Sequence, residues 1–191
     1  MAGLGYLVQH RALRSQVAGL GLVEVGWTAM MATLPVLALH GGGVSVAGWL
    51  LASYGAGSVV GGLISSRAGT VGGHAAAWAV AGVAVSAWLL LLPVPVWALT
   101  GAVAVNGVCS GIFFPRFFAA VTTGTPPGLR APVLTAVTIA ISAPGPLGYL
   151  GAGILAQRTH SGVPSLVLVA VTATLGALVV IRARAYRTGT G

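Results

Sequence analysis

The stretch GAGSVVGGLISSRAG, residues 55–69, determines how this chain is expected to fold. It begins as the glycine-rich end of an apolar run and finishes in a short segment that carries one arginine, Arg67. Gly57 and Gly61 are four residues apart, so they share one helix face, where a second helix can approach closely in a membrane. Arg67 and Gly69 predict a turn at a membrane surface, because hydrocarbon tolerates neither a charged side chain nor irregular backbone.

The composition excludes a soluble globular protein. Of the 191 residues, 57% are hydrophobic and 5% are charged, whereas a soluble domain has about 25% charged residues. We therefore expect an all-α, polytopic membrane protein in contact with the lipid bilayer. Nine arginines and one acid give a net charge of +8, but the apolar runs argue against a nucleic-acid partner, and the arginines are expected to anchor loops. The one cysteine, Cys109, permits no internal disulfide, and no cofactor or metal site is predicted.

Six apolar runs predict six transmembrane helices. Their expected ranges are 17–39, 46–65, 75–92, 96–120, 132–156 and 165–181. The chain then divides into a cytoplasmic N-terminal segment (1–16), a six-helix transmembrane domain (17–181) and a cytoplasmic tail (182–191). An even number of spans places both termini on one side, together with every arginine except Arg158. The positive-inside rule puts that side in the cytoplasm. A basic set made only of arginine in a chain rich in Ala, Gly and Val indicates a bacterial plasma membrane protein.

Polar and interrupted faces are confined to four of the six predicted helices. The first carries Glu24, Trp27, Thr28, Met31 and Pro35 on one face; the second Trp49, Ser53, Gly57 and Gly61; the fourth Asn106, Ser110, Phe113 or Phe114, and Phe117; the fifth Thr135, Thr138, Ser142, Gly145 or Pro146, and Tyr149. The third and sixth helices hold few polar residues and are expected to face lipid on all sides. Each polar face alone is typical of a helix contact, but four together favour a shared water-accessible cavity.

Residues 55–69 also resemble the loop between the second and third helices of each half of a major facilitator superfamily transporter. That pattern is Gly-x-x-x-Asp-Arg-x-Gly-Arg/Lys, and Gly62, Arg67 and Gly69 match it, while Ser66 and Thr70 depart from it. Residues 107–116 with 125–130 resemble the family's fourth helix and its Pro-x-x-x-Arg-Gly loop, with Ala131 in place of the glycine. Residues 142–148 resemble the Gly-Pro-x-Gly kink of the fifth helix.

The resemblance is nearest to drug, macrolide or siderophore exporters. It implies that helices one, two, four and five line the substrate path, that three and six lie outside, and that Gly62, Arg67 and Gly69 form a cytoplasmic gate loop. Six helices correspond to one half, most like the carboxy-terminal half, which pairs with a second six-helix half or a second copy. The predicted substrate and proton pathway consists of Glu24, Trp27, Thr28, Met31, Ser53, Asn106, Ser110, Phe113, Arg116, Thr138, Ser142 and Tyr149.

Glu24 is the sharpest candidate in that set. A carboxylate within a span costs about 2.5–3.5 kcal/mol on insertion scales and normally faces a cavity or a partner. Two roles are therefore expected for Glu24. It carries protons or binds a cationic substrate, or else it forms a structural ion pair. Arg116 is expected to pair with Glu24, to bind an anion, or to extend toward the headgroups. Pro144, Gly145 and Pro146 interrupt the fifth helix and form either a hinge or a static bend.

Transport of a small amphipathic or apolar molecule is therefore the expected function, with proton-coupled efflux as one form of it. The alternative is a non-transporting membrane subunit or a truncated fragment of a twelve-helix transporter. An intramembrane enzyme is not expected. Ser110-Gly111 lies on the fourth helix, as in rhomboid-like proteases, but Val108 replaces the first glycine of their motif and the sixth helix lacks the histidine base.

Overall fold

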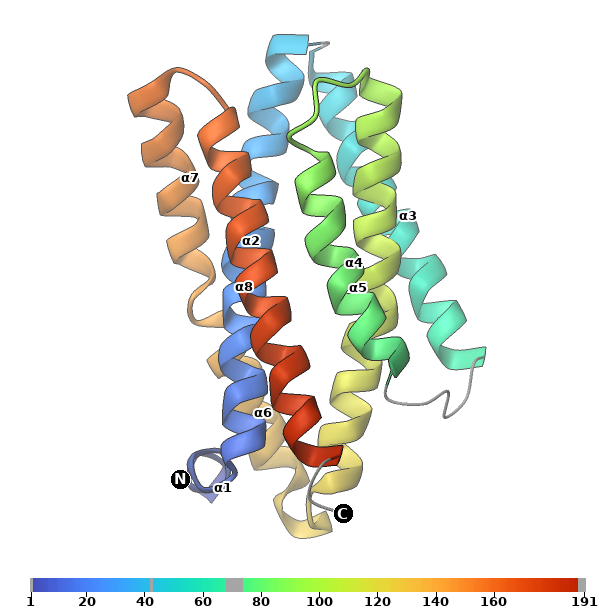
Figure 1. Cartoon of the computed structure of the whole chain (residues 1–191), viewed down its shortest axis with the longest axis vertical. Helices are drawn as coiled ribbons and strands as arrows, with labels where there is room; N and C mark the ends of the chain where they lie inside the picture. The colour runs from blue at the N-terminus through green and yellow to red at the C-terminus, as the bar shows by residue number, and fades with distance from the viewer. Residues whose placement is uncertain (1, 42, 68–73, 189–191) are drawn as a thin grey trace.

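The computed structural model describes residues 2–41, 43–67 and 74–188, and all regular structure in them is helical (Figure 1). The elements are α1 (Ala2–Gln9), α2 (Arg11–Gly41), α3 (Val44–Arg67), α4 (His74–Leu89), α5 (Val96–Gly124), the 3-10 turn η1 (Pro127–Leu129), α6 (Arg130–Ser142), α7 (Gly145–Thr159) and α8 (Val163–Thr188). They form one bundle of long helices, with α1 folded across the end that holds both termini.

Five stretches of the described chain are long and apolar enough to cross a membrane. These are Arg11–Ala38, Val44–Arg67, Val96–Gly124, Pro127–Thr159 and Val163–Ala183. They correspond to five of the six predicted spans. The sixth, predicted over 75–92, is the shorter apolar helix α4, whose 16 residues extend about 24 Å against about 30 Å of hydrocarbon. These helices make a polytopic membrane protein the class that the chain fits.

Proline determines where two of these helices start or stop. Pro95 precedes the first residue of α5, a position where the missing backbone N–H costs nothing. The predicted fifth span is two helices, because α6 ends at Ser142 and α7 begins at Gly145, with Pro144 between them. Pro144 lacks an N–H donor and its ring crowds the preceding turn. In Figure 1, α6 and α7 are visibly offset at this break.

The glycines of α3 pack it directly onto α5, the most extensive helix contact in the bundle. A Cβ atom on Gly57 would overlap the carbonyl oxygen of Ala104, and one on Gly61 would overlap that of Val108. The contact is reciprocal, because Gly107 and Gly111 of α5 lie against the carbonyl oxygens of Tyr54 and Ser58 on α3. The predicted close approach at Gly57 and Gly61 is confirmed, and a matching Gly-x-x-x-Gly pair on α5 supplies the other side.

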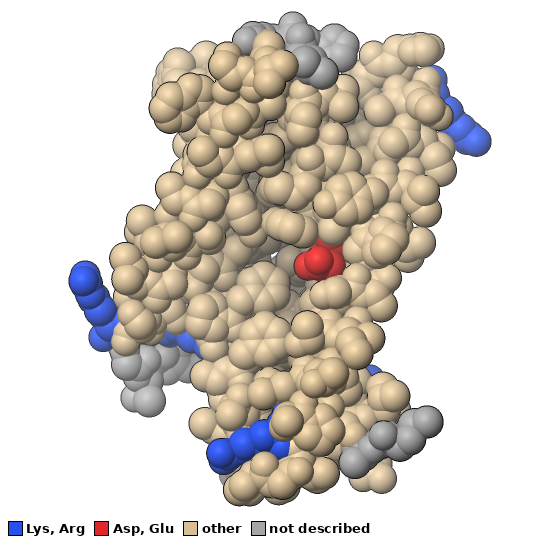
Figure 2. All heavy atoms as spheres, turned by 180° about the vertical axis from the view of Figure 1, so that it is seen from behind, with Lys and Arg blue, Asp and Glu red and all other residues tan. Residues whose placement is uncertain are grey.

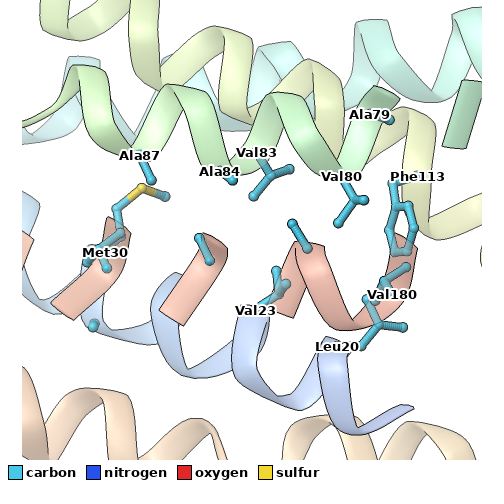
Figure 3. Close-up of a cluster of buried hydrophobic side chains, with 14 of the residues drawn as sticks. Leu20, Val23, Met30, Ala79, Val80, Val83, Ala84, Ala87, Phe113 and Val180 are labelled. Carbon is cyan, nitrogen blue, oxygen red and sulfur yellow. The ribbon is translucent and has the colours of Figure 1, made fainter. Parts of the chain in front are cut away.

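The apolar core lies between α2, α4 and α8 (Figure 3). Val80 and Ala87 of α4 and Ala170 and Val180 of α8 are each at most 1% exposed. The prediction that the third and sixth helices face lipid on all sides is therefore wrong. Their small side chains, read from the sequence as a lipid-facing surface, instead let α4 and α8 pack closely against α2, α5 and each other.

The helix contacts fall into two matching sets. α3 packs on α5 as α7 packs on α2, α4 packs on α5 as α8 packs on α2, and α4 also packs on α8. Exchanging α2 with α5, α3 with α6–α7 and α4 with α8 maps these contacts onto one another, although α7 also packs on α8 without an equal contact between α3 and α4. Since α2 and α5 run in opposite directions (Figure 1), the two three-helix units are inverted relative to each other.

Candidate functional site

A cavity of about 210 Å³ opens between α2 and α5. α2 contributes Glu24 and Trp27 to its wall, α5 contributes Asn106 and Ser110, and α3 contributes Tyr54. The remaining wall is apolar and comes from α2, α4, α5 and α8; it consists of Val23, Gly26, Met30, Val83, Ala87, Phe114, Val169 and Ala173. Four residues of the predicted pathway thus lie in one cavity, and α4 and α8 form its back wall.

Glu24 lies near the middle of the bundle. It is thirteen residues after the first residue of α2 and seventeen before the last. Figure 2, which views the molecule from behind, shows this acid at about mid-height beside a hollow, while one arginine side chain at the left edge of the view reaches a similar height. Its side chain is half-buried, and its carboxylate has no hydrogen-bond or ion-pair partner within residues 2–41, 43–67 and 74–188. Glu24 also lies next to the α6–α7 break, since a Cβ on Gly145 would be 3.7 Å from Oε1.

Two aromatic side chains stand beside this carboxylate. The rings of Trp27 and Tyr54 are 6.2 Å apart between centroids, at 49°. The indole Nε1 of Trp27 is buried and forms no hydrogen bond with any described residue. The Tyr54 hydroxyl faces the side chains of Trp27 and Ser110, with Glu24 nearby. The wall thus places a carboxylate without a hydrogen-bond donor among the described residues close to a buried indole N–H whose nearest polar neighbour is the Tyr54 hydroxyl.

Asn106 connects the cavity to its back wall. Its Nδ2 donates to the hydroxyl of Ser86 at 2.8 Å and to the carbonyl of Val83 at 3.2 Å, both on α4. Asn106 is 4% exposed, and among the described residues its amide oxygen accepts no hydrogen bond. The side chain therefore fixes α5 to α4 and leaves an acceptor at the cavity.

Other residues of the predicted pathway pack between helices. Thr28 lies at the α2–α7 contact, where its hydroxyl is 2.7 Å from the carbonyl oxygen of Gly145. Phe113 is buried and stacks on Phe117 within α5. Ser53 bonds within its own helix, to the carbonyl of Leu50 at 2.7 Å. Met31 is half-buried against the core and does not line the cavity.

Arg116 lies at the contact between α5 and α3. Its Nε donates to the hydroxyl of Ser65 at 3.2 Å, near the end of α3. Tyr54, which lies by Glu24, is eleven residues earlier on the same helix, a separation of about 16 Å. The contact with Ser65 places the Arg116 guanidinium near the end of α3, and its pairing with Glu24 stays a prediction.

The predicted residues of the fifth span face outward. Thr138, Ser142, Pro146 and Tyr149 are exposed and do not line the cavity, while Gly145 is buried against α2. The break at Pro144 is present, and its use as a hinge stays a prediction. Of the predicted gate loop, Gly62 and Arg67 end α3, with Arg67 exposed, and Gly69 lies outside the described residues.

Tyr54 and the wall from α4 and α8 were not predicted from the sequence. Tyr54 is a polar aromatic residue in the middle of an apolar run, next to the predicted Ser53, and that position was the available signal. Val83, Ala87, Val169 and Ala173 carried no signal, because apolar cavity walls and lipid-facing surfaces have the same composition.

Comparison with known proteins identifies no family for this chain. No protein-family model matches it, and no curated protein matches it significantly. The geometry is that of a polytopic helical membrane protein with a half-open cavity at mid-height. The cavity presents one carboxylate, one buried indole N–H, one amide oxygen and two hydroxyl groups on an otherwise apolar wall.

Proposed function

We propose that this chain is one six-helix half of a major-facilitator-type secondary transporter, and that its cavity binds a small amphipathic molecule. The observation that carries the proposal is the set of unpaired polar groups around Glu24, Trp27 and Asn106 at mid-height. An unsatisfied polar group in hydrocarbon costs several kcal/mol. The groups are stable there only if the cavity holds water or a ligand, and both are properties of a transport site.

The inverted packing supports the same proposal. Many secondary transporters consist of inverted repeats with the substrate site at their junction near the bilayer midplane. Here the cavity lies between α2 and α5. These two helices are the equivalent members of the two three-helix units. In this reading α4 crosses the membrane as the sixth span.

The composition of the wall suggests the class of substrate. Glu24 is the one acid, so a protonated amine or a proton is the charge that the cavity would accept. Trp27 and Tyr54 add flat apolar area, and the cavity volume of about 210 Å³ is below the roughly 300–1,000 Å³ of complete ligand sites. A second six-helix half, or a second copy, would complete the cavity.

The outward polar residues of α6 and α7 suggest where this partner docks. Thr138, Ser142 and Tyr149 are exposed, and Ser142 is three residues before Gly145, which lies beside Glu24. A polar stripe next to the cavity is costly against acyl chains and is better covered by a second helical unit. With the basic end in the cytoplasm, the cavity would alternate between the two sides of the membrane.

The test is proton-driven efflux of a lipophilic cationic dye from vesicles that contain the purified chain. We expect Glu24→Gln to abolish the dependence on the proton gradient while downhill dye movement persists, because the variant keeps the cavity but cannot exchange a proton. Thr100→Val is the matched control, since Thr100 bonds only within its own helix, to the Val96 carbonyl. Unchanged gradient-dependent efflux in Glu24→Gln would rule out proton coupling at this residue. No efflux by the wild-type chain, alone or with a partner half, would favour the non-transporting subunit.

A further inference from the structure

A second cavity, of about 320 Å³, lies at the end of the bundle that holds both termini. It forms where α1 meets α2 and where α5 ends. Its polar wall contains Gln9, His10, Arg11 and Gln16, and its apolar wall includes Leu13 and Val121. The hydroxyl of Tyr6 donates to the carbonyl of Gly124 at 3.1 Å, which joins α1 to α5 across the cavity.

The N-terminus of α2 opens into this cavity. α2 has 31 residues, so it carries the positive end of a full helix dipole. The backbone N–H groups of Arg11, Ala12 and Leu13 have no acceptor among the described residues; the first backbone bond of the helix is from Arg14 to His10, at 3.0 Å. All three residues line the cavity. Free N–H groups at a helix N-terminus form a ready site for an anion.

Gln16 is the independent sign that a ligand belongs here. Its side chain is 7% exposed, it lines the cavity, and it has no hydrogen-bond partner among the described residues. Its NH₂ group donates two hydrogen bonds, which is what an anionic oxygen at the helix N-terminus would accept.

The charged side chains around the cavity are positive, and no acidic side chain among the described residues accompanies them. Arg11 belongs to the wall, and the Nε of Arg130 donates at 3.3 Å to the carbonyl of Thr125, another residue of the wall. The Nδ1 of His10 is 2.8 Å from the carbonyl of Tyr6 and therefore donates to it. The only acid of the chain, Glu24, is thirteen residues from Arg11, about 20 Å along α2. No acidic side chain of the chain is therefore close enough to neutralise them.

We propose that this cavity binds a phosphate group, through the N-terminal N–H groups of α2, the Gln16 amide and the Arg11 guanidinium. Phosphate is the anion that fits a helix N-terminus and an arginine together. It can come from an anionic phospholipid headgroup or from inorganic phosphate. The apolar part of the wall and the place of the cavity at the basic end of the bundle agree with a headgroup, because basic pockets between membrane helices bind anionic lipids.

The experiment is a calorimetric titration of the full chain in a non-ionic detergent. The probes are a short-chain phosphatidylglycerol, the zwitterionic phosphatidylcholine of equal chain length, and inorganic phosphate. The variants are Arg11→Gln, whose exposed side chain is not needed for folding, and Gln16→Leu. The matched controls are Arg14→Gln, which removes an exposed arginine on the same helix that is not part of the wall, and Arg158→Gln at the opposite end.

We expect saturable binding of phosphatidylglycerol by the wild-type chain. The affinity should weaken by about fivefold or more in Arg11→Gln and in Gln16→Leu, which is the factor that one lost hydrogen bond predicts. The two control variants should bind as tightly as the wild-type chain. If inorganic phosphate binds with the same dependence on Arg11 and Gln16, the site recognises free phosphate. Three results would overturn the proposal: no saturable binding of either anion, equal losses in Arg11→Gln and Arg14→Gln, or phosphatidylcholine binding as tightly as phosphatidylglycerol.

Discussion

The contact between α3 and α5 gives the sharpest test of how this bundle is held together. Replacing Gly57 by alanine places a methyl group where the structure has the carbonyl oxygen of Ala104. Because the obstacle is backbone, no side-chain rotation relieves the overlap, and the helices must separate. Gly62, five residues along, has no neighbour within 4 Å of the same position. Gly62→Ala is therefore the matched control within one helix.

The difference in the free energy of unfolding between these two variants isolates the contribution of the contact between α3 and α5. Both change glycine to alanine inside α3, so both gain about 0.8–1.0 kcal/mol of helix propensity. Gly57→Ala alone also meets the cost of overpacking, about 1–3 kcal/mol. We expect Gly57→Ala to be less stable than Gly62→Ala by that amount. Gly61→Ala should behave like Gly57→Ala, and the double variant should lose less than the sum, because one separation of the helices relieves both overlaps.

The assay is reversible unfolding in mixed micelles, followed by tryptophan fluorescence, with the free energy of unfolding compared between variants. If Gly57→Ala and Gly62→Ala unfold at the same denaturant concentration, α3 does not pack on α5 through its glycines. The observed geometry of that contact would then be incorrect. A loss of stability in Gly62→Ala equal to that in Gly57→Ala would lead to the same conclusion.

Three further outcomes follow from the site. Asn106→Leu should lower the free energy of unfolding by about 1–2 kcal/mol, measured in the same unfolding assay. The variant removes two hydrogen bonds to α4, each of about 0.6 kcal/mol in a membrane, and leaves Ser86 without that donor. Trp88→Phe should cost about 0.6 kcal/mol by that assay, because the indole Nε1 donates to the hydroxyl of Thr174 at 2.9 Å. In a Cys109→Ala background, Ser110→Cys should react with a water-soluble thiol reagent, because Ser110 lines the open cavity, and mass spectrometry measures the labelling rate.

Each of these outcomes has a control in the same chain. Thr100→Val, on the exposed side of α5, should leave stability unchanged where Asn106→Leu lowers it. Trp78 is 76% exposed, so Trp78→Phe should lose less stability than Trp88→Phe. Ser86→Cys should stay unreactive, since Ser86 is 1% exposed. Labelling of Ser110→Cys as slow as that of Ser86→Cys would mean that the cavity is dry, which contradicts a transport cavity.

The sequence alone determined the class of the chain and several of its local features. A chain with 5% charged residues cannot cover a water-facing surface, so a membrane bundle follows from composition. Helical periodicity placed Glu24 and Trp27 on one face, and both line the cavity. Four-residue spacing brought Gly57 and Gly61 to one face, and both meet α5. These features follow from distances along one helix, which the 3.6-residue repeat fixes.

Only the tertiary structure decided which faces meet each other. Hydrocarbon and a protein interior are equally apolar, so nothing in the sequences of α4 and α8 distinguishes a lipid-facing helix from one that forms the core. The prediction that these two helices face lipid on all sides was wrong for this reason. The same ambiguity hid Tyr54 and left Thr138 and Ser142 assigned to a path that they do not line in this bundle. The separation of Arg116 from Glu24 depends on how far α5 is displaced along its neighbours. That displacement is determined by the reciprocal fit of glycines against carbonyl groups, which exists only once two helices are in contact.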